Sequence, residues 1–205
     1  EEWIQVLYRD GRMERVGIRK ALKDAHLIRQ IAASNPMDRV AILRFLLALL
    51  YWCKENLPDD ANAISGDSFF SGCLKKLEKE KNRDCFNLLG DGKRFYQYTK
   101  VTSGTDTKLS VNYLVQEVPT GTNLWHFRHS TDNINGLCQA CCAMGLLRLP
   151  SFATSGGRGK PPGVNSKPPI YVIPLGSSLA EILRLSWQAQ TPGLGTPAWE
   201  KPGLQ

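Results

Sequence analysis

The sequence predicts an α+β fold in which short strands accompany several packed helices. Residues 3–8 alternate apolar and polar side chains, as a half-buried strand does, and Asp10 and Gly11 follow as a turn signal. Residues 40–53 form a strongly apolar run whose leucines share one helical face. With 205 residues, 42% of them hydrophobic, the chain can bury these elements in one sizeable domain or two small ones.

The remaining elements follow from apolar spacing and from breaker residues. Asn35 and Pro36 should end one helix, Asp38 should cap the next, and Ser178 should cap the last. Further strands are expected at residues 16–18, 95–98, 109–117 and 170–174. Helices are expected at residues 22–33, 40–53, 69–82, 137–149 and 179–187. Residues 191–205 are rich in Pro and Gly and should form an extended tail, with Trp199 as an anchor.

Charge and composition limit the classes of protein to which this chain can belong. The net charge of +7 favours an anionic partner such as nucleic acid. No apolar run is long enough to span a bilayer, since Arg44 interrupts the longest, and no signal-peptide pattern is present. The six cysteines are therefore expected to be reduced thiols of a cytoplasmic protein that has no membrane partner.

A glycine-rich, basic segment is the strongest candidate for binding. It consists of Ser155, Gly156, Gly157, Arg158, Gly159 and Lys160. Glycine lets a backbone lie flush against another surface, and the cations suit phosphates, so the segment fits a nucleic-acid groove. A flexible surface loop is the alternative. Because Pro161 follows Lys160, the segment fails the phosphate-binding pattern of nucleotide hydrolases.

Two further groups of residues are candidate binding sites, one for nucleic acid and one for a metal ion. His126, Phe127, Arg128 and His129 could stack on bases and bind phosphate, or form a structural loop with a buried phenyl ring. Cys138 and Cys141 have the spacing of zinc ligands, but two thiolates are half of a structural site. They could equally be small core residues on a helix.

No catalytic constellation is visible, so we expect a protein that is not an enzyme. The alternatives are a small zinc-dependent enzyme that uses Cys138, Cys141 and a histidine, and a generic basic RNA-binding module. A stoichiometric metal and activity of the isolated chain would favour the first. Tight binding of nucleic acid without other subunits would favour the second.

Taken in order, several segments resemble the large subunit of the type I-E CRISPR surveillance complex, Cascade (the CasA family). The resemblance covers nearly the whole chain, and the order and spacing of its motifs carry it. The matching segments are Trp3-Ile4-Gln5-Val6, residues 16–30 and 40–50, Phe95-Tyr96-Gln97 (with Arg94 where the family has proline), residues 124–129 and 155–159, and Pro197-Ala198-Trp199.

The resemblance implies the following function. Residues 155–160 would face the minor groove of the protospacer-adjacent motif in duplex DNA, and residues 126–129 would lie near the 5′ handle of the crRNA. The subunit would promote target unwinding and R-loop formation, join other Cascade subunits and help recruit a helicase–nuclease. Cys138 and Cys141 would supply half of a zinc site. Residues 1–190 would form an N-terminal domain, and residues 191–205 would lead into a C-terminal part.

Overall fold

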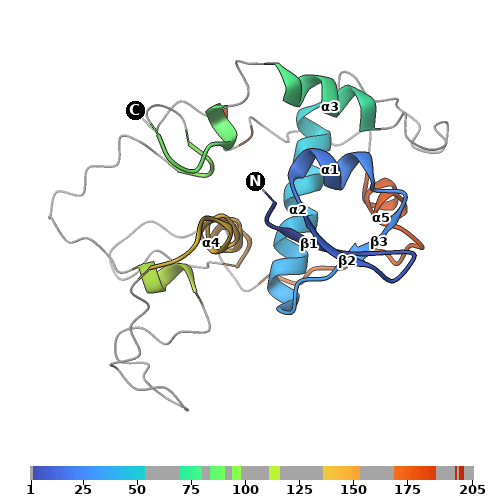
Figure 1. Ribbon diagram of the computed structural model, residues 1–205, viewed down its shortest axis with the longest axis horizontal. Coiled ribbons are helices and arrows are strands. Elements are labelled where there is room, and N and C mark those ends of the chain that lie inside the picture. Colours follow the sequence, from blue (N-terminus) through green and yellow to red (C-terminus); the bar gives the residue numbers. More distant parts are fainter. Residues whose placement is uncertain are drawn as a thin grey trace, which may run out of the picture.

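The computed structural model describes residues 2–53, 70–79, 84–90, 94–97, 111–115, 136–152, 169–187, 197 and 199–200. Its elements are β1 (Ile4–Tyr8), β2 (Met13–Val16), α1 (Ile18–Lys23), β3 (Ile28–Ile31), α2 (Pro36–Trp52), α3 (Ser71–Glu78), η4 (Asp84–Phe86), η5 (Val111–Leu114), α4 (Gln139–Phe152) and α5 (Leu179–Ser186). Short strands thus accompany helices around one core, which confirms the α+β class (Figure 1).

The three strands form an antiparallel sheet in the order β2-β1-β3. The expected first strand and turn are confirmed, because Gly11 has φ +89 and supplies the left-handed conformation that the hairpin needs. The second strand is placed earlier than expected. It ends at Val16, and Ile18 already begins α1 instead of continuing a strand at residues 16–18.

The helix expected at residues 22–33 is wrong. α1 ends at Lys23, and residues 28–31 form β3 against β1. A register shift opposite Leu7 and Tyr8 leaves an extra residue in β3, so that Ile28 and Ile31 both face the core although they are three residues apart. The bulge therefore gives this strand a spacing of apolar residues that is typical of a helix.

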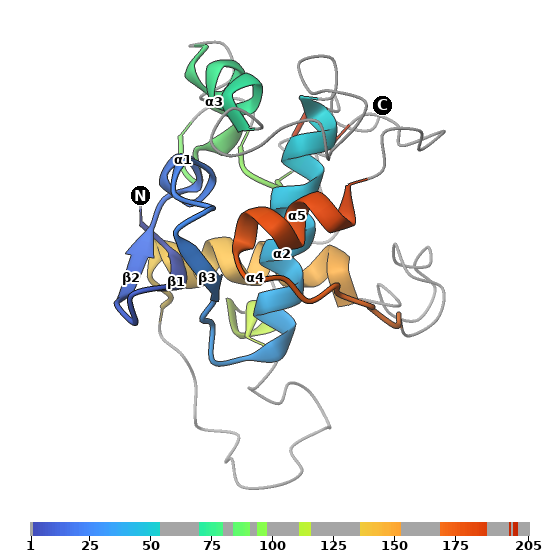
Figure 2. The same ribbon diagram turned by 90° about the vertical axis from the view of Figure 1, so that its right-hand side faces the viewer.

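Helix α2 is the central element, and α4 and α5 lie on opposite sides of it (Figures 1 and 2). It begins earlier than expected. The Asn35 side chain accepts a hydrogen bond from the Met37 amide at 2.8 Å, and Pro36 occupies the first turn, where its missing N–H costs nothing. Asp38 is therefore not the cap, contrary to the sequence-based expectation.

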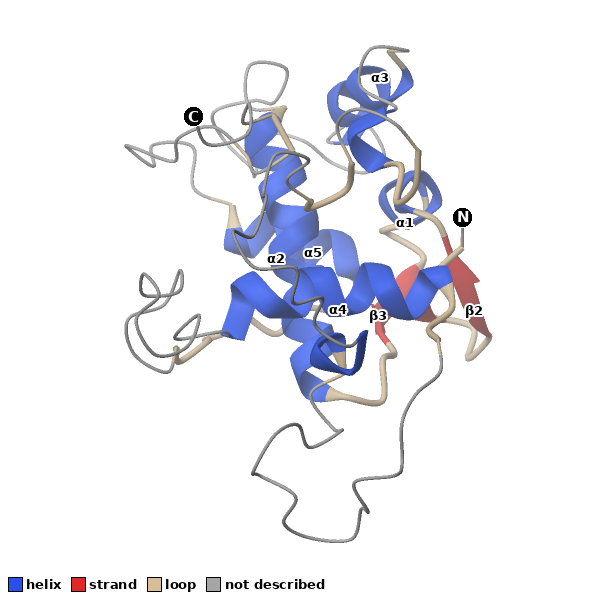
Figure 3. Ribbon diagram, turned by 90° about the vertical axis from the view of Figure 1, so that its left-hand side faces the viewer, coloured by secondary structure: helices blue, strands red, loops and turns tan. Residues whose placement is uncertain are grey.

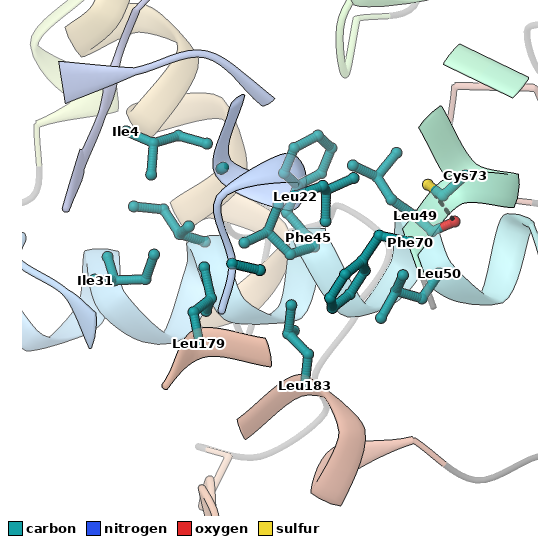
Figure 4. Packing of buried hydrophobic residues seen from close by; sticks show 14 of the residues in the cluster. Ile4, Leu22, Ile31, Phe45, Leu49, Leu50, Phe70, Cys73, Leu179 and Leu183 are labelled. Atoms are coloured by element: carbon teal, nitrogen blue, oxygen red, sulfur yellow. Dashed lines mark hydrogen bonds between the residues drawn. The ribbon is translucent and has the colours of Figure 1, made fainter. Parts of the chain in front are cut away.

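The hydrophobic core lies where α2 meets the sheet, α1, α3 and α5. Figure 4 shows Phe45, Leu49 and Leu50 of α2 beside Leu22 of α1 and Leu183 of α5. All five side chains are buried. Through these contacts, α2 positions the other elements of the described chain.

An aromatic cluster closes one side of this core. Trp199 is only 3% exposed, and its ring lies 5.9 Å from those of Phe45 and Trp52 and 5.8 Å from that of Phe86. The expectation that Trp199 anchors the end of the chain is confirmed.

The strand expected at residues 95–98 is wrong for its described part. Tyr96 has φ +53, and the chain turns between Arg94 and Gln97. The turn lets the adjacent Phe95 and Tyr96 rings both contact Phe45, which alternation along a strand would prevent.

Two more expected strands are absent from the described residues. Residues 111–114 form the 3₁₀ helix η5, and residues 170–174 are extended but pair with no other described strand. The helices expected near α3, α4 and α5 are confirmed, the last with Ser178 as its cap. Within the described residues, no helix combines the length and hydropathy that crossing a membrane requires.

Candidate nucleic-acid interface

Helix α4 connects the two segments that carry the predicted nucleic-acid contacts. His126, Phe127, Arg128 and His129 lie outside the described residues, and so do Ser155, Gly156, Gly157, Arg158, Gly159 and Lys160. The described residues that flank each group define where it is attached. Residues 136–138 lead into the start of α4, and the glycine segment follows its end at Phe152.

A buried ion pair fixes α4 on α2. Arg148 of α4 reaches Asp38 of α2 with Nε at 2.7 Å and Nη2 at 2.6 Å from the same carboxylate oxygen. The two side chains are 8% and 15% exposed. The two helices cross, as Figure 3 shows, so this pair is a fixed point between them. Sequence reasoning missed it; the only local signal was a cation inside the apolar run of residues 137–149.

A second contact joins residues on either side of the glycine segment to α2. The Tyr171 hydroxyl donates a hydrogen bond to the Ser151 carbonyl, and Arg44 of α2 donates to that hydroxyl and, at 3.4 Å, to the same carbonyl. The Arg44 guanidinium also lies over the Tyr171 ring, 5.0 Å from its centre. Tyr171 packs edge-on against Phe152 at 5.4 Å. We call Arg44, Ser151, Phe152 and Tyr171 the clamp.

The clamp brings together residues on either side of the glycine segment. Ser151 and Phe152 precede residues 153–168 and Tyr171 follows them, so the flanking residues meet at one place, beside Arg44 of α2. The sequence pointed to Arg44 only as an interruption of an apolar helix, and it gave no sign of the role of Tyr171.

Residues that flank the segment with the histidines also lie against or next to α4. Gly145 of α4 lies against Leu114 of η5, so closely that an added Cβ would be 2.7 Å from the Leu114 Cβ and 2.8 Å from its carbonyl oxygen. Leu114 precedes residues 116–135, and Leu137 follows them. Both line one cavity of about 410 Å³, beside Arg15.

The cysteine pair lies at the rim of this cavity. The Sγ atoms of Cys138 and Cys141 are 3.3 Å apart, and the Cys141 amide donates to the Cys138 sulfur at 3.4 Å. That backbone bond, with a further contribution from the Cys141 side chain, lowers the pKa of Cys138. The hydrogen bond to Cys138 raises the pKa of Cys141.

These two thiols fit two corners of a zinc site. Two sulfurs at about 2.3 Å from one tetrahedral zinc ion lie roughly 3.8 Å apart, so this pair would have to move slightly apart to bind one. Cys142 is directed elsewhere, with its Sγ 3.9 Å from the Leu137 carbonyl oxygen. The described residues contain no group of three or more ligand side chains that could hold a metal, so they supply half of a tetrahedral set.

All six cysteines belong to the described part of the chain, and all are free thiols, as expected. Cys53, Cys73 and Cys85 are buried, whereas Cys138 and Cys141 are exposed. The exposure of the pair disagrees with the alternative in which it forms part of the core.

The chain is similar to proteins of one family. A model of the family described as CRISPR-associated protein Cse1 (CRISPR_cse1) matches residues 1–205. The CRISPR-associated protein CasA/Cse1 of Thermus thermophilus is 29% identical over 213 residues. The match covers 100% of this chain and 42% of that relative, so the chain spans less than half the length of its relative.

Solved structures share the fold. The crystal structure of Cse1 from Thermobifida fusca superposes with a TM-score of 0.78 at 24% identity, over 100% of this chain and 42% of that one. Cse1 from Acidimicrobium ferrooxidans gives 0.75 at 24% identity, again over 100% and 42%. A chain of a structure described as a CRISPR RNA-guided surveillance complex gives 0.73 at 22% identity, over 100% and 46%.

Proposed function

This chain belongs to the CRISPR-associated protein Cse1 family, and from that membership we propose that it serves in the large subunit of a type I-E CRISPR RNA-guided surveillance complex, Cascade. In this role it binds and positions nucleic acid in antiviral defence and performs no catalysis of its own. The observation that supports the proposal is that residues flanking both candidate segments lie on or against α4, which is itself fixed to α2 by Arg148 and Asp38.

The glycine segment reads the protospacer-adjacent motif in this proposal. The minor groove displays few distinguishing groups, so it is read through shape and close approach of the backbone. Gly156, Gly157 and Gly159 permit that approach, and Arg158 and Lys160 hold the flanking phosphates. The clamp supports this role because it confines both ends of the segment and lowers the entropy lost on binding.

The segment with His126, Phe127, Arg128 and His129 contacts the 5′ handle of the crRNA in the same proposal. Its aromatic rings stack on unpaired bases and its guanidinium binds phosphate. Motif binding then opens the duplex, and the guide RNA reads the target by base pairing. The partners are therefore crRNA, double-stranded target DNA, other Cascade subunits and a helicase–nuclease that the subunit helps recruit.

We also propose that Cys138 and Cys141 hold a structural zinc ion together with ligands outside the described residues. The lowered pKa of Cys138 favours the thiolate that metal binding requires. Metal analysis of the purified protein tests this. We expect one zinc per chain, and Cys138→Ser should remove it while Cys142→Ser, the adjacent control, should not.

Gly157→Asp tests the motif-reading role directly. In the assembled complex, the new side chain should hold the backbone away from the groove and repel phosphate, so that motif-dependent target binding falls by at least tenfold. Gln30→Asp adds the same charge on an exposed strand and serves as the control. Unchanged target affinity of Gly157→Asp in a complex that assembles normally would reject the assignment.

Phe127→Ala tests the second segment. We expect it to weaken docking of the subunit at the crRNA handle, because a stacking platform is lost. If the variant joins the complex and binds target as the unaltered protein does, the segment has only a structural role.

A further inference from the structure

An extended segment on the outer side of the clamp presents an unusual apolar surface. Ile170, Val172 and Leu175 are 92%, 90% and 94% exposed, and neighbouring Leu185 of α5 is also exposed. Single exposed apolar residues are ordinary, but a group of them on one short extended segment marks an interaction site.

This segment belongs to no described strand, and its side chains at residues 170–172 alternate between exposed and partly buried, as those of a strand do. Among the described residues, no backbone hydrogen bond joins residues 170–173 to another segment. Tyr171 faces inward and is fixed by Arg44, while Ile170 and Val172 on either side of it face outward. The inward face is therefore occupied, and an alternating row of amides and carbonyls is left for a partner.

A groove lies beside this edge. Val172, Ile173 and Pro174 line a cavity of about 450 Å³ together with α2 and α5, which contribute mainly apolar side chains such as Leu43 and Ile182. A strand that pairs with residues 170–173 would place alternate side chains over this groove, the arrangement by which added strands gain both affinity and specificity.

The chemistry of the surface favours a polypeptide over nucleic acid. Residues 169–176 contain no charged side chain, and Arg44, the charged residue that lines the groove, is held by Tyr171 and Ser151. A phosphate backbone would find no cation there to replace its counterions. Pro174 has no N–H, so a main-chain ladder is confined to residues 170–173.

We infer that residues 170–173 accept a β-strand from the portion of a Cse1 chain that this sequence does not match. The match covers 42% of the Thermus thermophilus relative, so more than half of a family chain is left to pack against the portion described here. An uncovered apolar strand edge is the surface that such a portion would bury. The inference rests on family membership and is independent of the proposed contacts with nucleic acid.

Hydrogen exchange tests this inference on the 205-residue chain. The probe is a separate polypeptide that comprises the unmatched portion of the Thermus thermophilus relative. Its addition should slow amide exchange at residues 170–173 by at least tenfold, while exchange in the turn around Leu27 stays unchanged. If the probe fails to bind, or binds without protecting these amides, the inference is wrong.

Variants separate main-chain pairing from simple apolar contact. Val172→Pro removes one amide and should weaken binding of the probe at least tenfold. The double variant Ile170→Asp, Leu175→Asp keeps the backbone amides. It should weaken binding of the probe because two apolar side chains are lost. Leu27→Asp, at another exposed apolar residue, is the control and should bind normally.

The segment is extended and unpaired, so we expect the melting temperature of each variant to match that of the unaltered chain, which circular dichroism can verify. Normal binding by Val172→Pro would overturn strand addition. A second outcome is that the same amides are protected without the probe, in a dimer of this chain that Val172→Pro abolishes. This outcome would assign the edge to a second copy of the chain and would also overturn the inference.

Discussion

The guanidinium of Arg148 and the carboxylate of Asp38 form a buried ion pair between α4 and α2, although 110 residues separate them in the sequence. Both ends of α4 carry segments that are proposed to contact nucleic acid. The pair therefore fixes the position of α4 relative to the core.

Arg148→Ala should destabilise the protein by about 3–5 kcal/mol, because it leaves the Asp38 carboxylate without its partner in a largely dry site. Urea denaturation measures the loss. Arg19→Ala breaks an exposed ion pair with Glu78 at 3.7 Å and is the matched control, with an expected loss of less than about 1 kcal/mol. Equal losses in the two variants would contradict the structural role of Arg148.

Gly145→Ala should destabilise the protein, although alanine favours a helix. Its Cβ would meet the side chain and backbone of Leu114, and overpacking of this kind typically costs about 1–3 kcal/mol. Gly136→Ala is the control, because an added Cβ there meets nothing within 4 Å. Chemical denaturation of both variants distinguishes the tight contact from a general effect of replacing glycine.

The clamp should control target binding without contacting the target. Arg44→Ala removes the hydrogen bonds to Tyr171 and Ser151, so the ends of the glycine segment become less confined. We expect motif-dependent binding by the assembled complex to weaken about tenfold while assembly stays normal. Tyr171→Phe should show a smaller loss, since it keeps the ring contact with Phe152.

Arg29→Ala removes the same charge from an exposed position on β3 and controls for electrostatic attraction. The comparison should be made at two salt concentrations. If Arg44→Ala and Arg29→Ala weaken binding equally and only at low salt, Arg44 acts through its charge and the clamp has no positioning role.

Two tyrosines should make stability fall at alkaline pH. Burial, together with a hydrogen bond to Asp24 at 3.0 Å, raises the pKa of Tyr8 to about 12, and burial raises the pKa of Tyr96 to about 12. Unfolded tyrosine loses its proton near pH 10, so the unfolded state is favoured as the pH rises from about 10 to 12.

The slope of the unfolding free energy against pH measures this effect. Tyr8→Phe and Tyr96→Phe should each make the slope between about pH 10 and 12 shallower, whatever they do to stability at neutral pH. An unaltered slope in Tyr8→Phe would contradict the burial of its phenol in the folded state.

Local sequence patterns were sufficient to predict much of the fold. The strand before Asp10 and Gly11, the apolar helix around Leu46, and the cap at Ser178 all depend on neighbouring residues, and the structure contains each of them. Local chemistry of this kind is visible in a sequence because the interacting groups are a few residues apart.

The errors arose where tertiary contacts override local patterns. The bulge in β3 gave Ile28 and Ile31 a helical spacing, and the turn at Tyr96 serves an aromatic cluster that includes Trp199. The pair of Arg148 and Asp38 joins distant segments, so the cation in the apolar run of residues 137–149 could not by itself identify its partner. The roles assigned to residues 126–129 and 155–160 depend on the family resemblance and remain predictions.

The burial of Trp199 also bears on how the protein is made. Its ring fits beside Phe45, whose other neighbours include Trp3 near the opposite end of the chain. Such a contact has a very large sequence separation, which slows folding. During translation the aromatic cluster therefore stays open until Trp199 has left the ribosome, long after Trp3 and Phe45, and until then its exposed rings are available to chaperones and to aggregation.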